Sequence, residues 1–386
     1  MIQTIVAGTS EIDDVARSVE DIRLQLEAAG PLKKHTVGLL ACHYEFVLSG
    51  VVRALNDALP FDVTGTITAA QAGHGEVGTL RLCLTVLTSD DVEFITALTP
   101  SLLENPADAI RKTYAAVAQK DTAPSLIFAF APFMVENSGD DYVDVLSELS
   151  GGAPCFGTLA VDDTLDFSNC FLVHNGHHYR DHLALVLVYG EVKPRFFTAT
   201  ISMDKVLDRA ALVTKSAGHI LMELNDRPVA EYFENLGLTK ASETSYAMTS
   251  LPFMLDYNDG TPWVSKVFIG LTPEKYAICA GTMPEGASLY IGVFDKRDVL
   301  TTTGAAADQI VEAIEGASGL LIYSCISRNM TLGSDQLAEL DLFRDKIGDK
   351  VPFMMAYSGG ELCPTQVTDG HAINRFHNNA LIACVF

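Results

Sequence analysis

The chain has 386 residues, which favours two domains, because one domain usually holds roughly 100–200 residues. It carries 26 Lys and Arg against 49 Asp and Glu, and the formal net charge of −23 argues against binding to nucleic acid or to an anionic membrane. Apolar residues make up 48% and charged residues 19% of the chain, which is typical of a core-rich globular protein.

The sequence shows no signal for export or membrane insertion. Its longest clean apolar run, 183–189, has the length of a strand, and the N-terminus lacks a basic stretch followed by an apolar one. The eight cysteines are scattered and form no CxxC pair, as expected for reduced thiols. These features predict a cytoplasmic protein.

The first strong helix is predicted over 10–29. Its apolar residues recur at helical spacing, Ser10 and Asp13 resemble a capping box, and Gly30 with Pro31 ends the pattern.

A pattern of strand, helix, strand and strand then recurs three times, with a proline near the start of each second strand. The expected elements are first strands at 37–42, 126–131 and 320–325, helices near 48–59, 140–149 and 334–347, second strands at 60–65, 154–157 and 351–356, and third strands at 80–87, 183–189 and 381–386. Such apolar strands need burial on both faces, which predicts an α/β fold of mixed sheets with helices packed outside. The repeated proline favours a real β-α-β-β duplication over chance similarity.

The region between the second and third copies has a different pattern. Strands are expected over 198–224 and 252–294, with a helix between them that starts after Asn225-Asp226-Arg227-Pro228 and ends at Gly237. A further helix is expected over 305–314. The predicted domains are therefore 1–195, with two copies, and 196–386, with the inserted strands and the third copy.

Several motifs carry a family resemblance. They are residues 213–218 followed by 220–230, Cys325-Ile326-Ser327-Arg328 at a strand end, Gly360-Glu361-Leu362-Cys363-Pro364, residues 377–381, and 157–163, which end in Asp162-Asp163. Together they resemble the FIST family, in which a FIST N domain precedes a FIST C domain. The resemblance implies an intracellular sensory module that binds a small ligand such as an amino acid, needs no cofactor, and signals through a separate partner protein.

The sequence departs from the family pattern at three places. Ala356 stands where the family usually has Gly, Ser265-Lys266 where it has an Arg in a strand, and Ala70-Gln71 where a Gly-Glu pair is expected. These departures bear on the identity of the ligand. Lys266 is included in the expected ligand-binding set.

Arg328 and Glu361 are the leading ligand-binding candidates, together with Gly360 and Cys325 beside them. The Arg328 guanidinium could take a carboxylate in a bidentate fork, and Glu361 could take the ammonium group of the same amino acid. The alternative is that Arg328 and Glu361 pair with each other and hold the loops of the third copy.

Cys325 invites a second interpretation, in which the protein is an enzyme that acts on a small amino or keto acid. A nucleophilic thiol needs a lowered pKa and a base within reach, and the motif contains no His. Cys42 and Ala131 stand at the corresponding strand ends, which indicates that the position demands a small residue. Asp163 is the other candidate for a reactive group.

Asp162 and Asp163 follow a buried strand and could contact a cation or an ammonium group. Adjacent residues on a strand point to opposite faces, which disfavours a paired general acid and base. Capping of the loop by an Asx turn is the alternative.

The stretch His174-Asn175-Gly176-His177 predicts a two-residue hairpin turn that sets His174 opposite His177. Neither Cys nor a carboxylate completes a zinc set there, so a solvated hairpin tip is expected rather than a metal site.

The family resemblance and the candidate residues together predict a non-catalytic ligand sensor. An enzyme is the second alternative, and a scaffold that binds a basic partner protein is the third.

Overall fold

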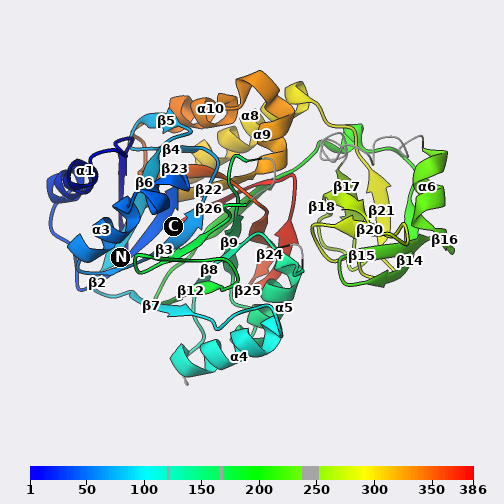
Figure 1. The fold of residues 1–386 in the computed structure, drawn as a ribbon, viewed down its shortest axis with the longest axis horizontal. Coiled ribbons are helices and arrows are strands. Elements are labelled where there is room, and N and C mark those ends of the chain that lie inside the picture. The colour runs from blue at the N-terminus through cyan, green and yellow to red at the C-terminus, as the bar shows by residue number, and fades with distance from the viewer. Residues whose placement is uncertain (120–121, 135, 165–167, 237–251) are drawn as a thin grey trace.

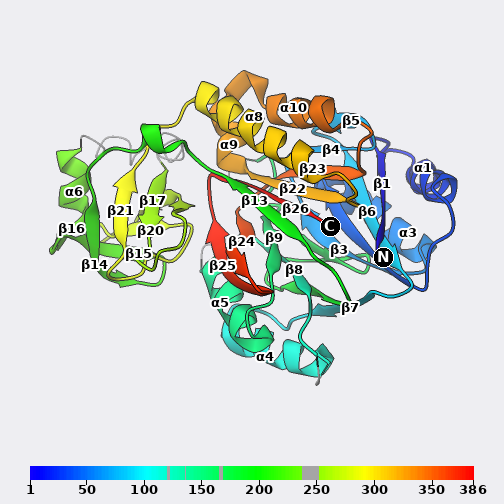
Figure 2. The same ribbon diagram turned by 180° about the vertical axis from the view of Figure 1, so that it is seen from behind.

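In a computed structural model of the chain, three six-stranded sheets form a body and a fourth sheet forms a smaller inserted domain beside it (Figure 1). The structure describes residues 1–119, 122–134, 136–164, 168–236 and 252–386. The inserted domain lies between β13 (Arg195–Ala199) and α8 (Lys296–Ala313) in the chain. Figures 1 and 2 place it at one end of the molecule. The sheets combine parallel and antiparallel strands and are covered by helices, so the fold is mixed α/β as predicted.

The three sheets of the body share one strand order. The first sheet contains β1 (Gln3–Thr9), β6 (Leu82–Ser89), β2 (His35–Cys42), β3 (Asp62–Ile67), β10 (Leu172–His174) and β11 (His177–Tyr179). The second contains β7 (Glu93–Leu98), β12 (Ala184–Tyr189), β8 (Leu126–Pro132), β9 (Cys155–Ala160), β24 (Glu361–Thr368) and β25 (His371–His377). The third contains β13, β26 (Leu381–Val385), β22 (Leu320–Cys325), β23 (Phe353–Ser358), β4 (Gln71–Gly73) and β5 (Glu76–Gly78).

Each sheet is centred on a parallel pair flanked by an antiparallel strand. The pairs are β2 with β3, β8 with β9, and β22 with β23, and the antiparallel strands are β6, β12 and β26. The strand order thus recurs in all three sheets. We still predict, from the sequence, that the three units arose by duplication.

Each sheet is completed by a hairpin that follows the second strand of another sheet. Hairpin β10–β11 follows β9 but pairs with β3, β24–β25 follows β23 but pairs with β9, and β4–β5 follows β3 but pairs with β23. The predicted domain border at 195 and 196 lies at the start of β13, which pairs with β26 near the C-terminus. That border stays a prediction about domain organisation.

The apolar strands alternate between two buried layers. In β22, Leu321 and Tyr323 face the core enclosed by the three sheets, whereas Leu320 and Ile322 face the helices outside. In β8, Phe128 likewise lies in the enclosed core. Side chains at even and odd positions are both buried, which explains why these strands read as continuous apolar runs.

Helices cover the outer faces of the sheets (Figures 1 and 2). They are α1 (Val15–Ala28), α2 (Glu45–Leu48), α3 (Val51–Ala58), α4 (Pro106–Val117), α5 (Gly139–Ser150), α8, α9 (Ile326–Leu332) and α10 (Ala338–Ile347), with the 3-10 turn η3 at Gly333–Asp335. Within the described part of the chain, no helix has the length and apolar character needed to cross a membrane.

Two of the predicted helices begin elsewhere than expected. The first begins at Val15, because the side chain of Asp14 accepts a hydrogen bond from the Arg17 amide and caps it. The helix predicted over 305–314 begins at Lys296 instead, after a capping box formed by Asp295 and Asp298 that the apolar spacing did not indicate.

Two other predicted helices are interrupted or shortened. The one expected near 48–59 is split into α2 and α3, because Gly50 takes a left-handed conformation with φ of 89° between them. The one expected over 334–347 begins at Ala338, since η3 precedes it.

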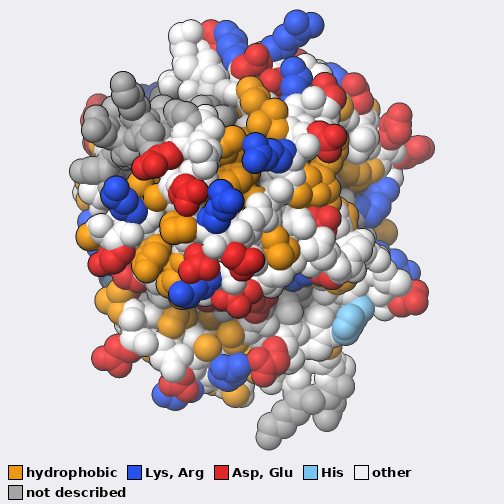
Figure 3. All heavy atoms as spheres, turned by 90° about the vertical axis from the view of Figure 1, so that its right-hand side faces the viewer, with side chains coloured by type: hydrophobic (Ala, Val, Ile, Leu, Met, Phe, Trp, Pro, Cys, Tyr) orange, Lys and Arg blue, Asp and Glu red, His pale blue; other side chains and the backbone are white. Residues whose placement is uncertain are grey.

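The inserted domain has its own sheet and its own core. Its elements are η1 (Met203–Lys205), β14 (Ala211–Ala217), β15 (Ile220–Leu224), β16 (Arg227–Pro228), α6 (Val229–Asn235), β17 (Phe253–Asp256), β18 (Val264–Lys266), β19 (Phe268–Leu271), β20 (Ala277–Cys279) and β21 (Ser288–Ile291). The strands predicted in this region are confirmed, whereas the predicted helix end at Gly237 lies outside the described residues. On the face turned away from the body, acidic and basic side chains are interspersed (Figure 3).

Candidate functional site

The carboxyl ends of the second strands of the three sheets meet in the body. Their backbones are joined in a closed ring of hydrogen bonds, from β9 to β3, from β3 to β23 and from β23 to β9. The bonds run from Val161 N to Ile67 O (3.1 Å), from Ala69 N to Tyr357 O (3.3 Å) and from Gly359 N to Leu159 O (2.8 Å). Loops that follow parallel strands commonly hold ligands in α/β folds. The predicted residues Cys325, Gly360, Glu361 and Asp162 belong to this region.

Glu361, at the start of β24, is completely buried beside the end of β22. The Ser358 hydroxyl donates to Glu361 Oε1 (2.9 Å), whereas Oε2 has no hydrogen-bond partner among the described residues. Burial raises the pKa of Glu361 well above its ordinary value, although Ser358 and the more distant Arg328 guanidinium lower it. Burial therefore favours the neutral form of this carboxyl group.

Cys325 ends β22 and pairs with Ser358 across the parallel strands. Its side chain is buried. Burial is the largest cause that raises the pKa of the thiol to about 12, and the neighbouring Glu361 is the second. Only a trace of thiolate exists at pH 7, which disfavours the interpretation of Cys325 as a nucleophile.

Asn378 and Asn379 follow β25 and complete a group of buried polar side chains. Ser327 Oγ lies 3.1 Å from Asn379 Oδ1, to which it can donate, but Asn379 Nδ2 and Asn378 Oδ1 have no partner. Gly360 has φ of 140°, and a Cβ there would lie 3.0 Å from Asn378 Nδ2 and closer still to the Phe376 ring, so only glycine fits. We name Cys325, Ser358, Glu361, Asn378 and Asn379 the Glu361 cluster.

Arg328 is held in place by Glu339 rather than by Glu361, so the predicted alternative of an Arg328–Glu361 pair is wrong. Its Nε and Nη2 lie 3.1 and 2.8 Å from Glu339 Oε1, and both side chains are fully buried. Nη2 also donates to Thr303 Oγ1 of α8 (2.9 Å). A bidentate fork to a ligand carboxylate is therefore not available, and the one nitrogen without a partner is Nη1.

The two adjacent aspartates, Asp162 and Asp163, differ in burial and in their contacts. Asp162 is buried and accepts hydrogen bonds from the amides of Thr164 (3.2 Å) and Asn169 (2.7 Å), so it caps its own loop, as the Asx-turn alternative predicted. Asp163 has 46% of its side chain exposed and lies 3.3 Å from Nε2 of His43, the residue that follows β2. Asp163 therefore remains accessible at the surface of this region, with His43 as its partner.

Lys266 lies in the joint between the inserted domain and the body, next to the end of β25 that leads to Asn378. Its Nζ is 2.7 Å from Asp140 Oδ2 in the first turn of α5 and 2.7 Å from the Phe376 carbonyl oxygen. The side chain is fully buried, and the Thr282 amide donates to the same Asp140 oxygen (2.7 Å). This ion pair connects the two parts of the molecule, so the structure gives Lys266 a structural role.

Several residues of this region were not predicted as site residues. Ser358 and Glu339 lie within apolar patterns, where no spacing indicates a function. Asn378 and Asn379 did have a signal, since three consecutive polar residues, from His377 onward, separate two apolar strands. The predicted hairpin is confirmed, with His174 opposite His177. Among the described residues, no three His, Cys, Asp or Glu side chains gather as a metal site.

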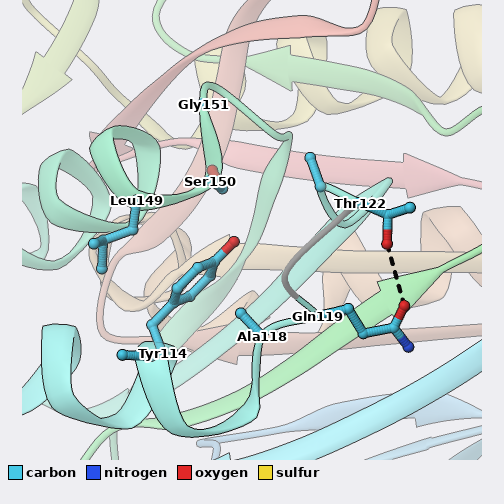
Figure 4. Close-up of a pocket in the computed structure, with 9 residues that line it drawn as sticks. Tyr114, Ala118, Gln119, Thr122, Leu149, Ser150 and Gly151 are labelled. Carbon is cyan, nitrogen blue, oxygen red and sulfur yellow. Dashed lines mark hydrogen bonds between the residues drawn. The ribbon is translucent and has the colours of Figure 1, made fainter.

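A separate cavity of about 490 Å³ lies between the ends of α4 and α5 (Figure 4). Tyr114 and Leu149 line it, and Gln119 Oε1 accepts a hydrogen bond from Thr122 Oγ1 (3.1 Å) at its edge. None of the residues predicted to bind a ligand lines this cavity.

The chain matches two protein-family models in tandem. The FIST N domain model matches residues 36–227, and the FIST C domain model matches residues 228–364. The border between them falls inside β16 of the inserted domain. A search of curated proteins gives no match. Among solved structures, the chain is similar to a cyanuric acid hydrolase from A. caulinodans at 10% identity and a TM-score of 0.37, over 100% of this chain and 99% of that one.

Proposed function

Because this chain belongs to the FIST family, whose domains are associated with sensory functions in signal transduction, we propose that it binds a small zwitterion such as an amino acid at the Glu361 cluster. In this proposal the protein acts in the cytoplasm, catalyses no reaction, and passes the signal to a separate partner protein. The observation that supports it most is the group of buried polar atoms without partners around the strand ends.

These atoms need an explanation, because nearly all buried polar groups in native proteins are hydrogen-bonded. Glu361 Oε2, Asn378 Oδ1 and Asn379 Nδ2 all lack a partner, although each side chain is at most 1% exposed. Leaving such a group unpaired costs about 1–3 kcal/mol. A ligand that bonds to them recovers this energy, which favours a binding site over a purely structural cluster.

The cluster offers complementary groups for the two ends of an amino acid. Glu361 Oε2 and Asn378 Oδ1 can accept hydrogen bonds from an ammonium group. Asn379 Nδ2 can donate to a carboxylate, and Arg328 adds positive potential from nearby, since its charge lowers the pKa of Glu361. The high pKa of the thiol argues against the alternative of an enzyme that uses Cys325.

A ligand ammonium stabilises the ionised form of Glu361, whereas burial favours the neutral form in the free protein. Binding should therefore release protons at pH values below the raised pKa of the free carboxyl, and affinity should increase as pH rises towards that pKa. Calorimetric titration of each amino acid in buffers of different ionisation enthalpy measures that release directly. Release of no proton by a bound amino acid would contradict the assignment to Glu361.

The first screen is thermal unfolding with a panel of amino acids. A ligand at about 100 times its dissociation constant adds about 2.7 kcal/mol to the unfolding free energy, a shift of several degrees. Glu361→Gln keeps the side-chain shape but removes the charge, and should weaken binding about tenfold or more. The matched control is Glu315→Gln at an exposed position, which should bind like the wild type. Absence of any shift across the panel would overturn the proposal.

A further inference from the structure

A second cavity, of about 440 Å³, lies where the inserted domain meets the body. Its walls come from the body, from the segment that leads into the inserted domain, and from the inserted domain itself. The lining residues are Phe196, Thr198, Pro364, Thr365 and His377 of the body, Thr200, Ile201 and Met203 of the connecting segment, and Met254, Pro262 and Trp263 of the inserted domain. Its volume falls in the range of small-molecule sites.

One residue that lines this cavity, His377, carries a buried hydrogen-bond acceptor with no partner among the described residues. His377 is 1% exposed, and its Nε2 lies 3.1 Å from the Cys363 carbonyl oxygen. A carbonyl oxygen only accepts, so Nε2 carries the proton and Nδ1 presents a lone pair. Burial lowers the pKa of His377 to about 4, so the ring is neutral at pH 7. Nδ1 has no hydrogen-bond partner in the structure.

The rest of the lining is uncharged and combines apolar side chains with Thr198, Thr200 and Thr365. Trp263 stacks on Tyr290 with ring centroids 4.3 Å apart and planes 18° apart, which holds the indole in place. Met254 is buried, and Phe196 contributes a second ring. The lining contains no Lys, Arg, Asp or Glu. Such a site disfavours a charged ligand, because the charge would lose its hydration without gaining a counter-ion.

We propose that this cavity binds a small, neutral, planar molecule whose N–H or O–H group donates a hydrogen bond to His377 Nδ1 while its ring packs beside Trp263. The site is distinct from the Glu361 cluster and takes a different class of ligand, so it goes beyond the proposed function. Because both parts of the molecule and the segment between them line it, a bound ligand also biases how the inserted domain sits on the body.

The test uses two probes of almost the same shape, phenol, which has a donor, and anisole, in which a methyl group replaces the donor hydrogen. Trp263 is the single tryptophan of the chain, so its emission, excited where tyrosine and phenol do not absorb, reports on the cavity alone. Saturation-transfer NMR of each probe gives an independent readout. We expect phenol to bind at least about tenfold more tightly than anisole, as a hydrogen bond to a buried acceptor would provide.

Two variants locate the site. His377→Phe keeps a ring but removes the acceptor, so the two probes should then bind equally. Thr200→Phe fills the cavity from its partly exposed edge and should weaken both probes about tenfold, whereas the same change at exposed Thr301 should leave them unchanged. Should His377→Phe fail to fold, the comparison of Thr200→Phe with Thr301→Phe decides.

Three results would overturn the proposal: no response of Trp263 to either probe, a preference for phenol that persists in His377→Phe, or equal binding by Thr200→Phe and Thr301→Phe. None of these results bears on the amino-acid site, because the phenol and anisole titrations leave Glu361 unchanged. Conversely, loss of amino-acid binding in Glu361→Gln leaves the phenol test intact.

Discussion

The carboxyl group of Glu361 is buried without a counter-ion bonded to it, because the nearby Arg328 is engaged by Glu339. The Ser358 hydroxyl donates a hydrogen bond to it, and the Cys325 thiol lies beside it. In the unfolded chain the same carboxyl returns to its ordinary pKa near 4.5. The folded protein therefore binds more protons than the unfolded chain at pH values between that value and the raised pKa.

This difference makes stability depend on pH in a definite direction. The free energy of unfolding should fall as pH rises through that window, because ionisation of Glu361 is easier in the unfolded state. Glu361→Gln cannot ionise, so it should lose less stability over the same window and gain on the wild type as pH rises. Denaturant unfolding from weakly acidic to weakly alkaline pH measures this, with Glu315→Gln as the control. Parallel profiles for Glu361→Gln and the wild type would show that Glu361 is not the group responsible.

For individual residues, the sequence predicted several side chains that lie together in the fold but not all of their partners. Cys325, Gly360 and Glu361 were predicted together, and the structure places them together. The partner of Arg328 could not be predicted, because Glu339 lies on a different helix and the two helices, α9 and α10, meet where both pack against α8. Lys266 was included because the resembled family has an Arg at that place in a strand, which does not say that the side chain reaches Asp140 of the body.

Among the elements, the second strands approach the first strands closely at one position each. Gly65 in β3 pairs with Leu40, and Gly157 in β9 pairs with Ala129. A Cβ at either glycine would lie 1.9 Å from the partner's carbonyl oxygen. The corresponding position of β23 holds Met355, which pairs with Ile322, so the third sheet accommodates a side chain where the other two hold glycine.

Substitutions in the second strands should have unequal effects on stability. Gly157→Ala forces β8 and β9 apart and should cost about 3 kcal/mol or more, as overpacking in a rigid core does. Ala356→Gly removes only one methyl group and adds backbone freedom, for a cost of about 1 kcal/mol. Thermal unfolding of the two variants measures both effects. A smaller loss for Gly157→Ala than for Ala356→Gly would mean that the strands can separate at little cost.

Apolar runs and turn residues in the sequence indicated most of the strands, because the central strands of each body sheet are buried on both faces. They did not indicate which sheet each hairpin joins. The hairpin after β3 has the local signals of any hairpin, yet Gln71 pairs with Ala356 of the third sheet. Partner choice of this kind depends on the packing of the three sheets together, which no local pattern records.

For the molecule as a whole, the joint between the inserted domain and the body depends on a few polar contacts. Lys266 bonds to Asp140, Arg375 lies 2.8 Å from Asp259, and the Asn378 amide donates to the Ser265 carbonyl (2.9 Å). The Lys266–Asp140 pair is the most buried ion pair of this joint. Removal of one partner leaves the other charge buried without its counter-ion.

Lys266→Ala should lower stability by about 3–5 kcal/mol, because Asp140 is left buried and unpaired. Hydrogen exchange should increase along β18 and the first turn of α5 more than in the enclosed core of the body. Denaturant unfolding and hydrogen exchange by mass spectrometry measure the two effects. Lys215→Ala, in which the lost side chain is 56% exposed, is the control and should change neither. Protection of β18 equal to that in the wild type would show that the joint does not depend on this pair.

The exchange of hairpins also limits how such a protein can evolve. A gene fragment that ended after residue 195 would encode β9 without the strand β24 beside it, and the hairpin β4–β5 without β23 to pair with. Neither segment could bury its backbone groups alone. The three units therefore cannot be shuffled between genes as independent modules. A mutation in one hairpin affects the stability of a sheet whose other strands lie more than a hundred residues away in the chain, so selection acts on both together.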